Sequence, residues 1–210
     1  MGSKKRLLKG SSLYVILDRD LLSVKRLLAT AEMSAKAGAD IFQLRDKKSS
    51  SQDMIKTARA LKKIADKYGI PLIINDRPEV ACAIDSDGIH IGQGDFGVTT
   101  VKRLAGKDSF VGVSVNDIKK AGKAISEGAD YLGAGPVFMT PIKSRRKAFG
   151  FNNLSKMIKY RIPVFAIGGI KNSNIRKLSE KGFKKVAVIR AVCQSHDPFR
   201  SVKELKGSLV

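Results

Sequence analysis

The chain alternates between short apolar runs and longer amphipathic stretches along its whole length. Each run covers five or six residues, which is too short for a buried helix, and Val, Ile and Leu dominate most of the runs. Apolar runs of this length are typical of parallel strands that are buried on both faces. The pattern predicts eight strands, over residues 13–17, 40–45, 71–75, 88–92, 110–114, 130–135, 162–167 and 185–189.

The stretches between the runs have the start and stop signals of helices. Ser50 or Ser51 can cap the second helix, because a serine hydroxyl accepts a hydrogen bond from an unpaired amide of the first turn. Glycine commonly follows the last residue of a helix. Four stretches end in this way, at Gly38, Gly69, Gly128 and Gly182. The predicted helices span residues 23–37, 51–68, 78–84, 98–105, 117–127, 152–160, 173–181 and 198–206.

Eight strands that are each followed by a helix predict an α/β fold, a single closed (β/α)8 TIM barrel of the phosphate-binding type. The length of 210 residues suits one domain, residues 1–210, in which residues 1–11 form a basic N-terminal segment that could be flexible. The alternative is an open doubly wound sheet, which commonly has about five or six strands and a glycine-rich turn after the first. Residues 18–20 follow the first run and contain no glycine, so the barrel is favoured.

The net charge raises the question of nucleic-acid binding. Forty Lys and Arg residues stand against 19 Asp and Glu, which gives a formal net charge of +21. The basic residues are scattered over nearly every predicted helix. Aromatic residues make up only 6% of the chain and Trp is absent, so platforms for base stacking are scarce. We therefore expect a cationic surface that steers anionic small-molecule substrates, and no specific recognition of nucleic acid.

Targeting signals and cysteine usage point to a cytoplasmic protein. No apolar stretch reaches the roughly 18 residues that a membrane span needs. Residues 1–10 are basic but lack the apolar region and the cleavage site of a signal peptide. Cys82 and Cys193 share no motif spacing and suit reduced, buried thiols. We expect no membrane partner; the oligomeric state stays open, a homo-oligomer included.

Candidate chemistry lies at the ends of the predicted strands, because a parallel barrel gathers these ends around one mouth. Gln43, Arg45 and Lys47 alternate at the end of the second run, so their side chains point to one side. An Arg fork and a Lys point charge close together suit phosphate oxygens. The alternative interpretation is the solvated start of a loop with unrelated charges.

The third and fourth runs supply the candidate metal ligands. Asn75 and Asp76 follow the third run, and Asp95 follows the fourth. Mg²⁺ is commonly held by one or two carboxylates together with waters and substrate phosphates, so Asp76 and Asp95 are predicted to bind it. Asp76 could instead cap the next helix. His90 could be a hydrogen-bonded core residue, and no second His or Cys nearby favours zinc.

The later strand ends complete the mouth. Ser114 closes the fifth run, and a basic loop, residues 133–147, follows the sixth and could close over a polyanion. Glycines after the seventh strand allow backbone amides to approach an anion, and the loops after strands seven and eight form a recurrent phosphate site in barrels. The candidates for this site are Gly168, Gly169, Ile189 and Arg190.

Six segments, in this order, resemble thiamine phosphate synthase. They are Gln-Leu-Arg-Asp-Lys (43–47), Ile-Ile-Asn-Asp (73–76), Gly-Ile-His-Ile-Gly-Gln-Gly-Asp (88–95), Gly-Val-Ser-Val (112–115), Asp-Tyr-Leu-Gly-Ala-Gly-Pro (130–136) and Ala-Ile-Gly-Gly-Ile (166–170). The resemblance covers about residues 13–192. It implies a transferase of thiamine biosynthesis that joins an aminopyrimidine methyl diphosphate to a thiazole phosphate, forming thiamine phosphate and releasing pyrophosphate.

The resemblance also implies roles for individual residues. Arg45, Lys47, Lys143 and Ser114 would be the catalytic residues. Ser114 would face the pyrimidine, and Thr140 and Lys143 would belong to the closing loop. Mg²⁺ would be bound by Asp76 and Asp95. The diphosphate would be held by Gln43, Arg45, Lys47 and Asn75, and the thiazole phosphate by Gly168, Gly169, Ile189 and Arg190. The implied mechanism is dissociative and needs no general base, which agrees with the lack of a convincing nucleophile–base pair in the sequence.

Three departures from the family pattern keep alternatives open. Ile142 stands where the family's loop has a second Thr, Arg190 replaces the usual Ser, and residues 144–147 add positive charge. A relative with a changed substrate is one alternative, and a non-catalytic cationic binding module is another. A related thiazole tautomerase would want a proton shuttle after the 112–115 segment, where relatives place a His and this chain has Asn116.

Overall fold

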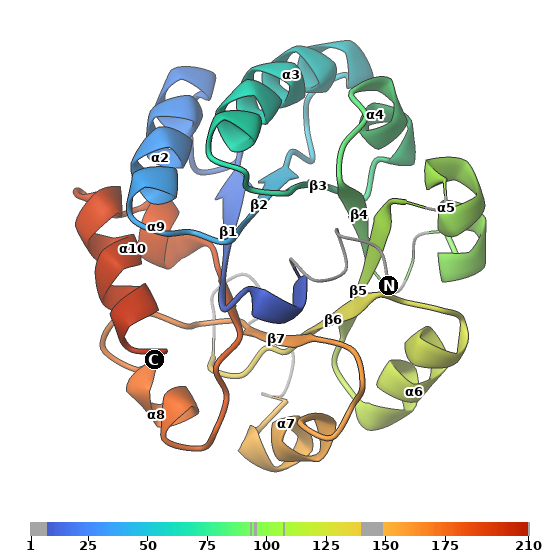
Figure 1. Cartoon of the computed structure of the whole chain (residues 1–210), viewed down its shortest axis with the longest axis vertical. Coiled ribbons are helices and arrows are strands. Elements are labelled where there is room, and N and C mark those ends of the chain that lie inside the picture. Colours follow the sequence, from blue (N-terminus) through green and yellow to red (C-terminus); the bar gives the residue numbers. More distant parts are fainter. Residues whose placement is uncertain (1–7, 93, 95, 107, 140–148, 210) are drawn as a thin grey trace.

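The strands form a closed parallel barrel in sequence order, which confirms the predicted (β/α)8 fold (Figure 1). The structure is a computed structural model that describes residues 8–92, 94, 96–106, 108–139 and 149–209. The barrel closes where β1 pairs with β8. The strands are β1 (Leu13–Asp18), β2 (Ile41–Arg45), β3 (Leu72–Asn75), β4 (Gly88–Ile91), β5 (Phe110–Val115), β6 (Tyr131–Ala134), β7 (Val164–Ile167) and β8 (Val186–Val188).

Helices surround the barrel on its outside (Figure 1). Ser23 and Ser50 cap α2 and α3 through their side chains. The glycines predicted to end helices have positive φ angles of 96°, 65°, 93° and 83°, a conformation that glycine adopts without steric cost. The predicted helices are α2 (Val24–Lys36), α3 (Ser51–Lys67), α4 (Pro78–Ala83), α5 (Val98–Ala105), α6 (Ile118–Ser126), α7 (Phe151–Met157), α8 (Arg176–Ser179) and α10 (Pro198–Gly207).

Two helices differ from the prediction. The helix expected over residues 173–181 is reduced to the four residues of α8, and turns precede it. A further helix, α9 (Arg190–Cys193), begins directly after β8 and was not predicted. A single helical turn is too short to show an amphipathic period, so the sequence pattern carries no signal for it. This turn lies where phosphate-binding barrels place a short extra helix.

The two cysteines differ in their surroundings. Both are free, and Cys193 is buried, which raises the pKa of its thiol to about 11. Cys82 is exposed on α4, so the expectation that both thiols are buried is wrong for this residue. Short helices at the surface present one face to solvent, and Cys82 lies on that face of α4 whereas Val80 and Ala81 pack inward.

The barrel interior has its own apolar core, separate from the core between strands and helices. Leu8, in a helical turn at residues 8–10, packs on this interior core from the end opposite the mouth and is only 2% exposed. Figure 1 shows this turn in front of the centre of the barrel. The described part of the basic N-terminal segment therefore closes that end. The other members of the interior core are Tyr14, Ile16, Ile41, Ile73, Phe110, Tyr131, Phe165 and Ala187.

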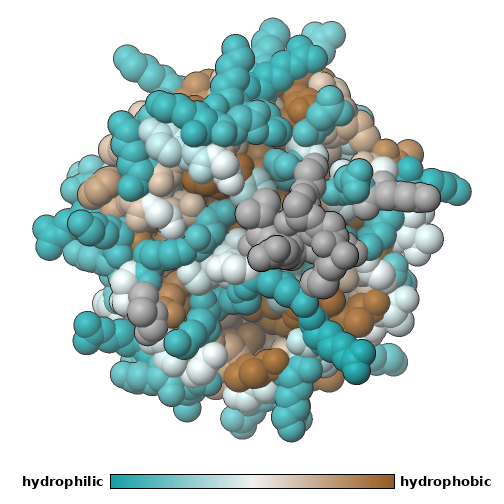
Figure 2. All heavy atoms as spheres, viewed as in Figure 1, coloured by the Kyte–Doolittle hydropathy of each residue, from teal (hydrophilic) through white to brown (hydrophobic). Residues whose placement is uncertain are grey.

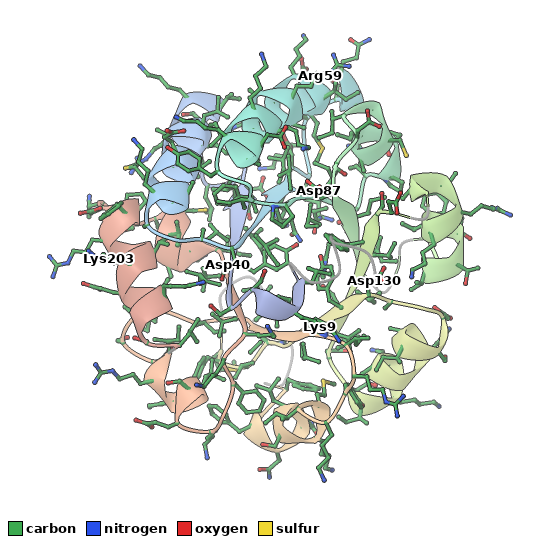
Figure 3. The ribbon with its side chains drawn as sticks, in the orientation of Figure 1. Lys9, Asp40, Arg59, Asp87, Asp130 and Lys203 are labelled. Carbon is green, nitrogen blue, oxygen red and sulfur yellow. The ribbon has the colours of Figure 1, made fainter. Side chains whose placement is uncertain are left out.

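Three aspartates fix the strands at the end of the barrel opposite the mouth. Each directly precedes an even-numbered strand and accepts a hydrogen bond from a backbone amide at the start of the preceding strand. Figure 3 shows the three around the ring. The pairs are Asp40 with the Leu13 amide at 2.8 Å, Asp87 with the Leu72 amide at 3.0 Å, and Asp130 with the Val111 amide at 3.0 Å.

Each of these aspartates also has a lysine partner from a surrounding helix. Lys206 binds Asp40, and the Nζ–carboxylate distances are 3.7 Å for Lys62 with Asp87 and 3.2 Å for Lys102 with Asp130. The position before β8 is Lys185, which instead donates to backbone carbonyls of residues 9 and 11. These contacts fix the strand register and connect the helices to it. Stabilising contacts of this kind are typical of this face of a barrel. Polar side chains surround the same face in Figure 2.

Replacing Asp130 by Ala is expected to lower the free energy of unfolding by about 1–3 kcal/mol. The reason is that the Val111 amide loses its acceptor and Lys102 loses its partner. Urea unfolding followed by circular dichroism measures the change. Asp108→Ala, at an exposed turn, is the control. Equal stability of the two variants would show that the aspartate does not hold the strands.

A second prediction concerns acid stability. Burial alone would raise the pKa of Asp40, but the Leu13 amide and the Lys206 ammonium outweigh it, so the net pKa lies below the ordinary value. A lowered folded-state pKa contributes stability that is complete above the unfolded value of about 3.9 and is lost as the pH falls below it. Asp40→Asn should therefore flatten the fall in stability below about pH 4. Parallel pH profiles of wild type and variant would contradict this.

Candidate active site

The C-terminal ends of the strands surround one cavity of about 820 Å³. This volume lies within the range of about 300–1,000 Å³ that is usual for small-molecule sites. Thr140, Lys143 and Asp95, which were predicted to take part, lie outside the described residues. All the other predicted site residues line the cavity, namely Gln43, Arg45, Lys47, Asn75, Asp76, Ser114, Gly168, Gly169, Ile189 and Arg190.

Two carboxylates orient the guanidinium of Arg45. Its Nη1 atom lies 2.9 Å from both carboxylate oxygens of Asp18 and 3.1 Å from Oδ2 of Asp20. Hydrogen bonds from Lys48 and then Arg45 hold the pKa of Asp20 below its ordinary value, so this side chain stays ionised. Sequence reasoning missed both aspartates as site residues. Their signal was their place at the C-terminal end of β1, where Asp18 is the last residue of the strand and Asp20 follows it.

Lys47 and Asp76 form an ion pair at the edge of the cavity. Asp76 has a positive φ of 58°, and its amide donates to the carbonyl of His90 at 2.8 Å. A non-glycine residue in this conformation costs energy and is typical of functional sites. Helix α4 has Arg77 as its N-cap and no side-chain capping bond. The interpretation of Asp76 as a helix cap is therefore wrong.

The oxygen donors at the end of β3 fit a hard cation such as Mg²⁺. Asn75 and Asp76 offer an amide and a carboxylate oxygen toward the same cavity. Within the described ranges, no group of three or more His, Cys, Asp and Glu side chains is placed to hold a metal. Asp95, the second predicted ligand, lies outside the described residues, and substrate phosphate oxygens and waters commonly complete the coordination of Mg²⁺. Magnesium binding stays a prediction.

The loop after β7 needs glycine at two consecutive positions. Gly168 and Gly169 have φ angles of 101° and 65°. A Cβ atom at Gly168 would lie 2.6 Å from Cα of Pro136, and one at Gly169 would lie 2.7 Å from the carbonyl oxygen of Met139. Only glycine fits this close approach between the loops that follow β6 and β7.

A side chain that sequence reasoning missed fixes the shape of this loop. Asn174 accepts from the Lys171 amide at 2.9 Å and donates to the Gly169 carbonyl at 2.8 Å. Lys171 and Asn174 both line the cavity, as does Arg190, the first residue of α9. Asn174 lay in the first turn of the helix predicted over residues 173–181, and Lys171 lay just before that helix, which hid their role. Two cations and a glycine loop thus meet at the β7–β8 side.

A chain of hydrogen bonds crosses the barrel interior beneath the cavity. It runs from Gln43 to Tyr14 (2.7 Å), Tyr131 (3.0 Å), His90 (3.0 Å) and Ser114 (2.9 Å). The first four residues are at most 7% exposed. Burial raises the pKa of both tyrosines well above its ordinary value, so both remain hydroxyls. Of the two interpretations of His90, the structure therefore supports the hydrogen-bonded core residue and not the metal ligand.

The position of the proton shuttle expected for a tautomerase holds an amide. Asn116 lines the cavity, and its Oδ1 accepts a hydrogen bond from Nζ of Lys120 at 2.7 Å. A carboxamide neither gains nor loses a proton near neutral pH, so this residue cannot act as the acid and base of a proton shuttle.

The closed barrel, its cationic mouth and the glycine loop after β7 define an enzyme of the phosphate-binding barrel class. The model of the thiamine monophosphate synthase family matches residues 13–192, so the chain belongs to this family of transferases. Thiamine-phosphate synthase of Clostridium botulinum is 40% identical over 93% of this chain and 92% of its own length. That of Clostridium tetani is 40% identical over 93% of this chain and 94% of its own length.

Solved structures agree with this assignment. Thiamine phosphate pyrophosphorylase from Pyrococcus furiosus superimposes with a TM-score of 0.88 and is 32% identical, over 98% of this chain and 96% of that chain. (S)-3-O-geranylgeranylglyceryl phosphate synthase from Thermoplasma acidophilum has a TM-score of 0.73 at 15% identity, over 100% of this chain and 98% of that chain, and shares the fold alone. These relatives support the synthase interpretation, and none of them supports the tautomerase or the binding module.

None of the described helices combines the length and the apolar character that a membrane crossing requires.

Proposed function

We propose that the cavity couples an aminopyrimidine methyl diphosphate to a thiazole phosphate, giving thiamine phosphate and pyrophosphate. The observation that carries the proposal is that residues suited to anions line one cavity from two separate groups of strands. Arg45, Lys47 and Asp76 converge from β2 and β3, whereas Gly168 and Arg190 come from the β7 and β8 loops. Each of the two substrates carries one phosphorylated end, and each side of the cavity suits one of these ends.

The β2–β3 side suits the diphosphate. Arg45 is held in place by Asp18 and Asp20, so its guanidinium needs little reordering to meet phosphate oxygens. Bound Mg²⁺ would neutralise the negative charge that develops on the departing pyrophosphate. Asp76 would hold the cation together with Asn75. Lys47, now paired with Asp76, could then exchange this carboxylate for a phosphate oxygen.

The β7–β8 side suits the thiazole phosphate. Glycines at consecutive left-handed positions expose backbone amides to an anion, and Asn174 holds that loop in shape. Lys171 and Arg190 add two positive charges at the same side. Arg190 is exposed at the cavity rather than buried within it, which favours contact with phosphate over filling of the pocket.

The coupling requires one bond to break and one to form. The bond between the pyrimidine methylene and the diphosphate oxygen breaks, and its electron pair leaves with pyrophosphate. The thiazole nitrogen then donates its lone pair to the methylene carbon and becomes positively charged. No proton has to be removed before the new bond forms. Positioning of the two substrates and stabilisation of the leaving group therefore account for catalysis.

In the presence of Mg²⁺, the purified chain is expected to convert the two substrates into thiamine phosphate and pyrophosphate in equal amounts. Chromatography of the product and a coupled pyrophosphate assay measure the two. Controls omit each substrate or the metal. Thiamine phosphate should be absent from every control. Isomerisation of a thiazole phosphate without coupling would instead support the tautomerase, and no turnover of either kind would contradict the proposal.

Replacing Asp76 by Asn is expected to lower kcat/KM at least about a hundredfold, because the leaving group loses charge stabilisation. Asn tolerates a left-handed backbone, so the fold should be kept. Asp85→Asn is a matched control, since Asp85 also has a positive φ, of 49°, but does not line the cavity. Wild-type turnover by Asp76→Asn at saturating magnesium would refute the proposed role.

A cytoplasmic location stays a prediction from the sequence, and the oligomeric state stays open.

A further inference from the structure

The buried chain of hydrogen bonds has both of its ends at the cavity. Gln43 and Ser114 line the cavity, whereas Tyr14 and Tyr131 lie in the core of the barrel. The chain joins five strands, β2, β1, β6, β4 and β5, so it spans the barrel rather than following one strand. The resemblance to thiamine phosphate synthase places Ser114 against the pyrimidine, and Gln43 lines the same cavity at the other end of this hydrogen-bond chain.

The donors and acceptors along this chain follow one direction. Gln43 donates from Nε2 to the hydroxyl of Tyr14. Each tyrosine hydroxyl has one proton to donate. Because the Tyr14 hydroxyl accepts from Gln43, its own proton is donated to Tyr131, and the Tyr131 proton is donated to Nδ1 of His90. A neutral imidazole that accepts at Nδ1 carries its proton on Nε2. That nitrogen therefore donates to Oγ of Ser114, 2.9 Å away.

We propose that Tyr14, Tyr131 and His90 are positioning residues that fix Gln43 as a hydrogen-bond acceptor and Ser114 as a donor toward the pyrimidine ring. This inference rests on the proposed function, since it assumes that the pyrimidine lies between the two ends. With its Nε2 engaged by Tyr14, Gln43 offers Oε1 to the cavity. With its oxygen accepting from His90, Ser114 acts toward a substrate through its hydroxyl proton.

This pattern selects an aminopyrimidine over its oxo analogue. An exocyclic amino group is a donor and the ring nitrogen beside it is an acceptor, which complements an acceptor and a donor on the protein. The oxo analogue presents an acceptor and a ring N–H donor, the reverse pattern. A buried site that is built for one pattern rejects the other strongly, because its own polar groups would be left unpaired.

Packing holds in place the hydrogen-bond chain from Gln43 to Ser114, which we call the relay. Gly112 leaves room for the Tyr131 ring, since a Cβ atom there would lie 2.0 Å from its Cζ atom. Phe165 packs edge-on against the rings of Tyr14 and Tyr131, with centroids 5.4 and 5.9 Å apart. A rigid ring can hold a hydroxyl at one point, which is what a relay between two fixed ends requires. A Tyr→Phe substitution keeps this packing and removes only the oxygen.

The Ser114–His90 contact has the distance of a nucleophile–base pair but not its proton arrangement. An activating histidine accepts the serine proton at Nε2 and donates from Nδ1 to an orienting group. In the relay Nε2 carries the proton and Nδ1 accepts from Tyr131. The position of one proton on His90 therefore separates a positioning relay from an activated serine.

The first test uses the free protein and needs no catalysis. The chain has two histidines, and the other one, His196, is exposed, so the imidazole signals in a ¹⁵N-resolved NMR spectrum are few. We expect the buried imidazole to be neutral with its proton on Nε2, and Tyr131→Phe to shift it toward the other tautomer. A proton on Nδ1 in the wild type would overturn the relay.

The second test measures substrate discrimination. Tyr131→Phe and Tyr14→Phe should each lower the ratio of kcat/KM for the amino over the oxo pyrimidine diphosphate at least about tenfold, with the KM for thiazole phosphate unchanged. Tyr68→Phe is the matched control, since it loses one hydroxyl and a 2.6 Å bond to Glu32 on the outer helices. An unchanged ratio in both relay variants would refute the positioning role.

The two tests separate the relay from the activity on which it rests. If the wild type fails to couple any pyrimidine diphosphate, the proposed function is wrong. The inferred preference for the amino over the oxo pyrimidine is then wrong as well. The tautomer of His90 still decides whether the relay has the stated direction. If coupling occurs and His90 carries its proton on Nδ1, the function stands and the relay is refuted.

Discussion

Closure of the parallel barrel is the constraint on which the rest of the structure depends. Pairing of β1 with β8 brings the ends of strands that are far apart in sequence around one cavity. The register of this ring decides which residues reach the mouth. A shift by one residue would turn Gln43 and Arg45 outward. Asp40, Asp87 and Asp130 bind strand amides at the opposite end and so secure the register.

On the β2–β3 side of the mouth, the cationic side chains are already paired. Arg45 lies between two aspartates, and Lys47 is bound to Asp76. Such pairs hold cationic side chains in place without a ligand, and they lower the reordering that binding demands. The β7–β8 side differs, because there backbone amides and exposed cations would meet the phosphate. The two sides therefore suit two anions of different charge.

Much of this arrangement could be predicted from the sequence. Short apolar runs and glycine stops predicted the strands and helices, and the residues at the strand ends included many of those that line the cavity. The site residues and the helix that the sequence did not reveal depend on features that a local pattern cannot show. Asp18, Tyr14 and Tyr131 function through partners on other strands, and only the closed ring shows which partners meet. Helix α9 is too short to give a period, and Asn174 was hidden in a predicted helix that is largely a series of turns.

We propose that Asp76, Arg45 and Lys47 form a site for a magnesium-bound pyrophosphate. Calorimetric titration of pyrophosphate into the metal-free chain, with and without Mg²⁺, probes this site without catalysis. We expect binding at one site per chain that is much tighter with Mg²⁺ and that loses this metal dependence in Asp76→Asn. Binding of equal strength with and without Mg²⁺ in the wild type, or an unchanged metal dependence in the variant, would contradict it.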